Sequence, residues 1–139
     1  MSLGDRPKAQ YYAPAADPRK AQSTEALALM EAARRLNAAR ELVERDVEAY
    51  RESLRLNWRL WTIIQCDIAS AENSMPDELK ANIMSLSIFV DRQTLDALSQ
   101  PAASKLGILI DINRNVAGGL LARQPAPPVR LRPAPAAAA

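Results

Sequence analysis

The strongest apolar periodicity of the chain lies between residues 54 and 68, which hold both tryptophans. Its first stripe, with steps of four, three, three and four residues, is Leu54, Trp58, Trp61, Ile64 and Ile68. A second stripe beside it is Leu56, Leu60 and Ile63. This spacing predicts an α-helix whose apolar face is wider than one partner helix can cover. We therefore expect this segment in the middle of a bundle, with the tryptophans mostly buried and Arg55, Arg59 and Gln65 facing solvent.

The segment belongs to a longer stretch, residues 19 to 75, that contains neither glycine nor proline and is rich in helix-forming residues. The apolar pattern falters at Arg40 and again at Glu44, Arg45 and Asp46, where charged residues lie on every face of a helix. We predict one helix over about 23–43 and a second over about 46–71, with Asp46 as the N-cap of the second. A single unbroken helix is the alternative.

The second half of the chain predicts two more helices. Residues 73–76, Asn-Ser-Met-Pro, form a clear break, and a third helix is expected from about 77 to 99. Its middle part is apolar on nearly every side, through Ile83, Met84, Leu86, Ile88, Phe89 and Val90. Such a helix is either buried all round or offers a groove or patch to another chain. Pro101 ends it, and a fourth helix is expected from 102 or 103 to about 121.

These elements predict an all-α fold, a compact bundle of about four helices with disordered N- and C-terminal tails. The helical domain is expected over 19–121. Residues 1–18 contain three prolines and predict a flexible arm, and residues 122–139 predict a Pro/Ala-rich disordered tail.

Charge is distributed unevenly between the predicted bundle and its ends. The net charge of the chain is +2, but residues 21–122 carry 11 Lys/Arg against 14 Asp/Glu, a net of −3. The two ends carry 7 against 2, a net of +5. Direct nucleic-acid binding by the bundle is disfavoured, because phosphate contact requires a basic surface. Only the ends offer one, and solvated ends are the simpler interpretation.

Catalytic and metal-binding patterns are missing from the sequence. The chain has no histidine and one cysteine, which excludes zinc sites of Cys/His type and every His-based nucleophile relay. We expect no cofactor, no metal and no enzymatic activity, and we interpret Cys66 as a small buried hydrophobic residue. The longest uncharged run is the ten residues 81–90, and no signal peptide is recognisable at the start. A cytoplasmic location without a membrane segment is expected.

Three asparagines, Asn57, Asn82 and Asn113, lie at or beside apolar faces. Hydrogen bonds that fix helix register are the simpler interpretation, and recognition of a partner is the other.

Three sequence motifs, taken together and in order, resemble the FlaF family of flagellar biosynthesis regulators. They are Asn57-Trp58-Arg59-Leu60-Trp61-Thr62, then Met75 to Ile83 with Leu86, Phe89 and Val90, then Leu109-Ile110-Asp111-Ile112-Asn113-Arg114. The resemblance extends from about residue 18 to 121. The chain departs from it at Met75, where leucine is expected, at Gly118, where alanine is usual, and in its long C-terminal tail.

The resemblance implies a small helical protein without catalysis that is needed for flagellin to be made or exported. It implies flagellin as a partner and, as a second partner, a FlbT-type regulator that acts on flagellin messenger RNA. Two roles remain open: a chaperone or adaptor that holds an amphipathic helix of flagellin, or a post-transcriptional regulator of flagellin expression. The candidate partner-binding residues are Trp58, Trp61, Met84, Ile88, Phe89 and Asn113.

Overall fold

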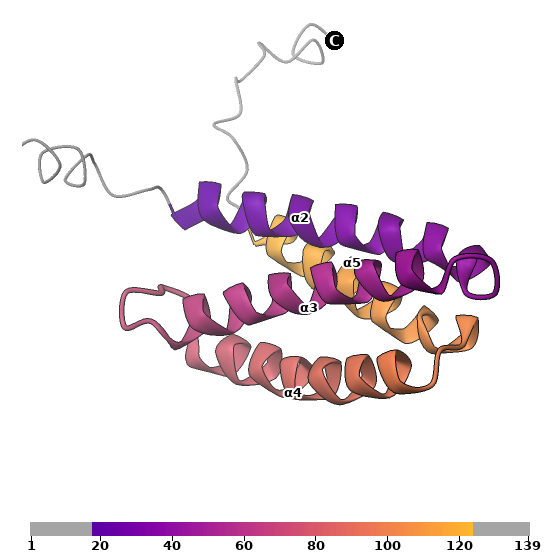
Figure 1. Ribbon diagram of the computed structural model, residues 1–139. Coiled ribbons are helices and arrows are strands. Elements are labelled where there is room, and N and C mark those ends of the chain that lie inside the picture. Colours follow the sequence, from indigo (N-terminus) through magenta and orange to yellow (C-terminus); the bar gives the residue numbers. More distant parts are fainter. Residues whose placement is uncertain (1–17, 124–139) are drawn as a thin grey trace, which may run out of the picture.

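The computed structural model describes residues 18–123, and this part of the chain is helical without strands (Figure 1). Its elements are α2 (Pro18–Ala39), η1 (Arg40–Leu42), α3 (Val47–Ala69), α4 (Asp77–Ser99), η2 (Ala103–Lys105) and α5 (Gly107–Ala122), where η marks a short 3-10 turn. The predicted all-α bundle is confirmed. The arm expected over 1–18 and the tail expected over 122–139 lie outside the described residues, apart from the residues at which α2 begins and α5 ends.

The break between the first two helices is confirmed, and the alternative of one unbroken helix is wrong. The α-helical hydrogen bonding of α2 stops at Ala39 and tightens into η1. Asp46 then caps α3, since its carboxylate accepts a hydrogen bond of 3.0 Å from the Ala49 N–H. The fourth expected helix is divided, because the chain first makes the separate turn η2 before α5 begins at Gly107.

The four α-helices form a bundle in which α3 lies between α2 and α4 (Figure 1). α2 and α5 pack against each other most extensively, and α3 packs on both α2 and α4. α4 contacts α5 only slightly, so α4 is covered mainly from one side. The expected central place of the tryptophan helix is therefore confirmed.

The core combines one buried face from each helix. Its largest fully buried side chains include Trp61, Tyr50, Leu29, Leu36, Leu54, Leu106, Leu109, Ile110 and Val90. Burial of each Leu, Ile or Val side chain contributes about 1.5 to 3 kcal/mol relative to exposure. The first stripe of α3 is buried except at Trp58, which is half-buried. The second stripe lies at the edge of the core, because Leu56 and Leu60 are half-buried and Ile63 is exposed.

Candidate functional site

A buried polar network links three helices at the centre of the bundle. The Trp61 indole Nε1 donates to Asn113 Oδ1 at 2.9 Å. The Asn113 amide nitrogen donates to the Leu29 carbonyl at 3.2 Å and to Asn57 Oδ1 at 2.7 Å. All three polar side chains are fully buried. Their hydrogen bonds join α2, α3 and α5 and fix how these helices align, although the buried Nδ2 of Asn57 has no partner among the described residues.

This network corrects two of the candidate partner-binding residues. Trp61 and Asn113 have no exposed surface, so they position the bundle and do not reach a partner in this fold. Register fixing, the simpler interpretation of the asparagines, describes Asn57 and Asn113. Asn82 differs from both because its side chain is exposed.

Trp58 belongs to a second polar contact, between α3 and α4. Its indole Nε1 donates to Asp91 Oδ1 at 2.8 Å. Two turns further along α3, the Gln65 amide donates to Ser87 Oγ at 2.5 Å and to Asp91 Oδ2 at 3.4 Å. The expectation that Gln65 faces solvent is therefore wrong: its amide is used between the helices. Trp58 keeps part of its surface exposed beside α4.

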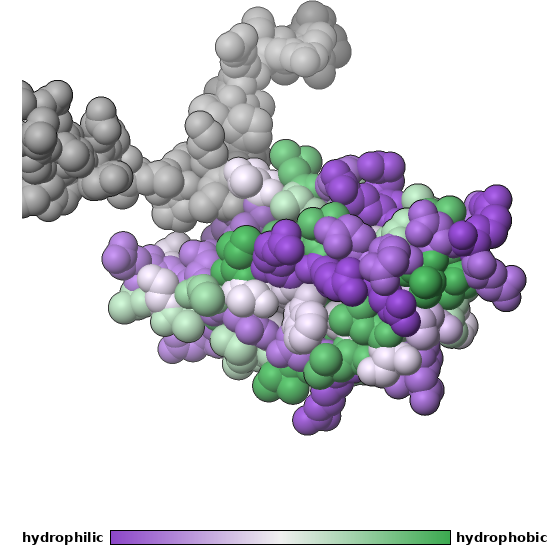
Figure 2. All heavy atoms as spheres, in the orientation of Figure 1, coloured by the Kyte–Doolittle hydropathy of each residue, from purple (hydrophilic) through white to green (hydrophobic). Residues whose placement is uncertain are grey.

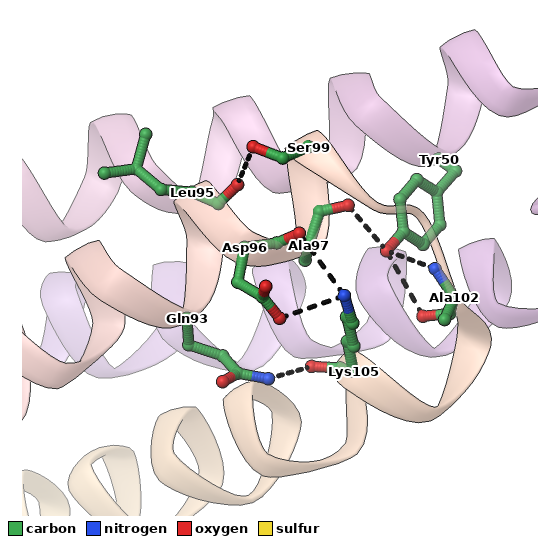
Figure 3. A network of polar contacts seen from close by, with 8 residues as sticks. All are labelled: Tyr50, Gln93, Leu95, Asp96, Ala97, Ser99, Ala102 and Lys105. Carbon is green, nitrogen blue, oxygen red and sulfur yellow. Dashed lines mark hydrogen bonds and ion pairs between the residues drawn. The ribbon is translucent and has the colours of Figure 1, made fainter.

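Tyr50 holds the far end of α4 in place (Figure 3). Its hydroxyl lies 3.1 Å from the Ala97 carbonyl and 3.2 Å from the Ala102 carbonyl, and it accepts from the Ala102 N–H at 3.1 Å. Gln93 adds a hydrogen bond of 2.9 Å to the carbonyl of Lys105. Buried or half-buried polar contacts thus join α3, the end of α4 and η2. Among the described residues, the outer side of α4 takes no part in them.

That outer side carries three of the large apolar residues that the bundle leaves exposed. The others are spread over α2, α3 and α5, and they are Leu27, Met30, Ile63, Ile108 and Leu121. Ile88, Phe89 and Leu95 are 49%, 40% and 50% exposed, and we call these three residues the α4 apolar surface. Met84 is half-buried beside them and packs against the core. Figure 2 shows apolar side chains along the lower edge of the molecule, where Figure 1 places α4.

Helical geometry divides the α4 apolar surface into a line and a flank. Ile88 and Leu95 are seven residues apart, so they lie two turns from each other on nearly the same line. Phe89 is turned about 100° from Ile88. Both candidates, Ile88 and Phe89, are exposed. Leu95 was not among the sequence candidates, although its spacing of seven from Ile88 is the signal that identifies it.

Comparison with models of known protein families shows to which family the chain belongs. The model of the family described as flagellar protein FlaF matches residues 7–120. The chain belongs to the FlaF family. No curated protein and no solved structure matches it.

The three motifs shared with the FlaF family have different roles in the structure. The first and third contribute Asn57, Trp61 and Asn113 to the buried network. The second begins at the turn before α4, where Met75 is buried and its N–H donates to Asn73 Oδ1 at 2.9 Å. It ends on α4 with Phe89 and buried Val90. Most of the FlaF signature is therefore scaffold, and its exposed apolar part lies on α4.

The rest of this FlaF-family fold was searched for metal-binding groups, reactive side chains and membrane-spanning helices. In residues 18–123, no group of three or more Cys, Asp or Glu side chains is placed to hold a metal ion. Cys66 is exposed, so its interpretation as a buried residue is wrong: it lies on the side of α3 that faces away from the core. None of the described helices is both long and apolar enough to cross a membrane.

One pair of acidic residues is electrostatically unusual. Glu25 near the start of α2 hydrogen-bonds to Asp67 near the end of α3, and Asp67 also accepts from Asn73 Nδ2 at 3.3 Å. Burial, the hydrogen bond to Asp67 and the repulsion from its charge raise the pKa of Glu25 to about 7. No local sequence pattern indicates this pair, because its members are 42 residues apart.

Proposed function

We propose that this protein binds flagellin through the α4 apolar surface and acts, without catalysis, as a chaperone or adaptor in flagellin synthesis or export. The observation that carries the proposal is the exposure of Ile88, Phe89 and Leu95 on one helix of a FlaF-family fold. Three large apolar side chains on the outer side of an otherwise well-packed helix suit a partner that brings its own apolar face.

The geometry of the surface suits an amphipathic helix. Ile88 and Leu95 offer two contacts along a line two turns apart, and Phe89 offers an aromatic contact beside them. A helix that docks in this way presents apolar side chains at spacings of three, four and seven residues. The terminal helices of flagellin, which must not polymerise before export, have this character.

The charge of the described bundle favours a protein partner over RNA. Residues 21–122 carry a net charge of −3. The α4 apolar surface itself is flanked by both signs, with Arg92 one turn after Ile88 and Asp96 beside Leu95. Binding to phosphate groups would require a consistent basic surface. The alternative role, control of flagellin messenger RNA directly or through a FlbT-type partner, is separated from the first by the experiment below.

The test is calorimetric titration of flagellin into the full chain and its variants, at low and at high salt. Ile88→Glu and Leu95→Glu place a carboxylate on the α4 apolar surface, and Ala38→Glu adds the same charge at an exposed position of α2 as the matched control. We expect the two α4 variants to lose at least about tenfold in affinity, because a buried unpaired charge costs more than 1.4 kcal/mol. Ala38→Glu should bind as the unmodified chain does, and circular dichroism should show equal helix content in all three.

Two further measurements, the salt dependence of flagellin binding and a titration with RNA, separate the two candidate roles. Apolar contact depends weakly on salt, so flagellin affinity should change little between the two conditions. Flagellin binding that survives both α4 substitutions would overturn the proposal. A second titration uses the leader of flagellin messenger RNA: RNA binding together with absent flagellin binding would transfer the function to the regulatory alternative.

A further inference from the structure

α2 and α5 pack side by side in opposite directions and leave a surface hollow of about 420 Å³ along their junction (Figure 1). The hollow is lined by Leu27, Met30, Glu31, Arg34 and Asn37 of α2 and by Arg114 of α5. Leu27 and Met30 are 65% and 47% exposed, so two large apolar side chains stand uncovered at this junction. Because α4 contributes no residue to the lining, this surface is separate from the α4 apolar surface.

Two opposite charges beside the hollow have no partner within the described chain. The carboxylate in the lining, Glu31, already accepts hydrogen bonds from Arg34 and Arg35. Asp111 precedes Arg114 by three residues, and both are exposed, yet neither forms an ion pair with a described residue. Glu31 and Arg34 have the same spacing on α2 and do pair, at 2.8 Å. α5 therefore presents an unpaired cation and an unpaired anion one turn apart.

The same side of α5 carries backbone without side chains. Gly118 and Gly119 are exposed, and a Cβ atom added at either would meet no neighbouring atom within 4 Å. Glycine destabilises a helix relative to alanine, and the packing of the described chain does not require it at these positions. Gly118 follows Asp111 by seven residues, as Leu121 follows Arg114, so each pair lies on nearly one line of the helix. Room for the close approach of another backbone thus adjoins the two unpaired charges.

We propose that this face of α2 and α5 binds a second copy of the chain, in a two-fold dimer whose α5 helices pack antiparallel. A two-fold interface brings the same surface of both copies together, so each group on it needs its complement on that same surface. The unpaired charges meet this condition, because Asp111 of each copy then lies opposite Arg114 of the other. A face that carried charge of one sign would instead suit a different protein of opposite charge.

Apolar contact completes the interface. Leu27 and Met30 of α2 and the 42% exposed Leu121 of α5 flank the charged pair and lose their contact with water when the two faces meet. Gly118 lets the two α5 backbones approach each other. The α4 apolar surface takes no part, so the dimer carries two such surfaces and the inference goes beyond the proposed binding of flagellin.

The experiment is analytical ultracentrifugation of the full chain over a range of concentrations. We expect a reversible equilibrium between monomer and dimer. Asp111→Arg and Arg114→Asp should each weaken the dimer at least about tenfold, because like charges then face each other at both symmetry-related contacts. An equimolar mixture of these two variants should regain the affinity of the unmodified chain, since one variant is positive at both positions and the other is negative. Met30→Glu should weaken the dimer without rescue by either variant.

Arg59→Asp is the matched control, since it makes the same charge change at an exposed arginine of α3 and should leave the dimer intact. Circular dichroism should show equal helix content in all variants. A chain that stays monomeric at every concentration would overturn the proposal, including the case in which Met30→Glu lowers the melting temperature and so shows that the chain's own residues fill the hollow. Single variants that dissociate but do not associate when mixed would overturn it too, as would a dimer that is lost in Ile88→Glu. Flagellin is not used, so this result and that of the flagellin titration are independent.

Discussion

α3 and α4 are both 23 residues long, yet they use their apolar residues in different ways. α3 turns Leu54, Trp61, Ile64 and Ile68 into the core. α4 buries Ile83 and Val90 but leaves the α4 apolar surface exposed. α3 has neighbours on both sides, whereas α4 packs mainly on α3. The difference indicates that α3 is scaffold and that α4 divides its surface between scaffold and interface.

The polar contacts support the same division. Those of α3 point inward, from Trp61 to Asn113 and from Trp58 to Asp91, and each joins α3 to a different helix. Those of α4 lie on its α3 side or at its end, as with Ser87 and Gln93. Within residues 18–123, the polar contacts of α4 thus leave its outer side unused.

The largest expected effect tests whether α3 is scaffold. Trp61→Ala should lower the free energy of unfolding by about 3 to 5 kcal/mol, because it removes a fully buried indole and leaves Asn113 without its donor. Trp58→Ala should cost about 1 to 2 kcal/mol, since that ring is half-buried. Urea unfolding followed by circular dichroism measures both. Equal losses for the two variants would contradict the distinction between the two tryptophans.

The second prediction compares two isoleucines of α4. Ile83 is 3% exposed and Ile88 is 49% exposed. Ile83→Ala should cost about 2 to 4 kcal/mol through lost burial and a cavity, whereas Ile88→Ala should cost less than about 1 kcal/mol. Thermal unfolding of both variants is the measurement. If Ile88→Ala destabilises as strongly as Ile83→Ala, the outer side of α4 is part of the core and the comparison with α3 fails.

The periodicity of apolar residues was sufficient to predict the buried face of α3. It was insufficient to predict which apolar residues of α4 are buried and which are exposed. In α3, one inward stripe and a run of charges before Asp46 specify both the buried face and the start of the helix. In α4, Ile83, Met84, Ile88 and Phe89 surround the axis, so the pattern cannot say which of them faces α3. That choice depends on where the neighbouring helices lie, which is a tertiary property.

The remaining differences also arise from tertiary structure. Gln65 seemed polar and exposed, but Asp91 and Ser87 on α4 accept its amide hydrogens. Cys66, the next residue, seemed buried by its type, yet the helix turns it outward. Arg40 packs against Gly107, which is 67 positions away along the chain. No local pattern contains such information.

The smallest expected effect concerns the contact between Asp67, near the end of α3, and Glu25 on α2. The pKa of Glu25 is raised from 4.5 to about 7 in the folded protein. Between these values the folded state binds more protons than the unfolded state, so stability falls as the pH rises from about 4.5 to 7 and stays low above that range. Glu31 on the same helix has the opposite slope: Arg34 and Arg35 lower its pKa to about 2, and its contribution is present above pH 4.5 and lost on acidification.

Glu25→Gln keeps a donor for Asp67 without a titrating proton. It should stabilise the protein by about 1 kcal/mol at pH 8, a value reduced because Glu25 is partly exposed and screened by solvent. At pH 5, where Glu25 is already protonated, the variant and the unmodified chain should have nearly the same stability. Glu31→Gln is the control and should not stabilise at pH 8, since it removes a favourable ion pair. Urea unfolding at both pH values measures these differences. A Glu25→Gln effect of the same size at pH 5 and pH 8 would show that repulsion from Asp67 is not its cause.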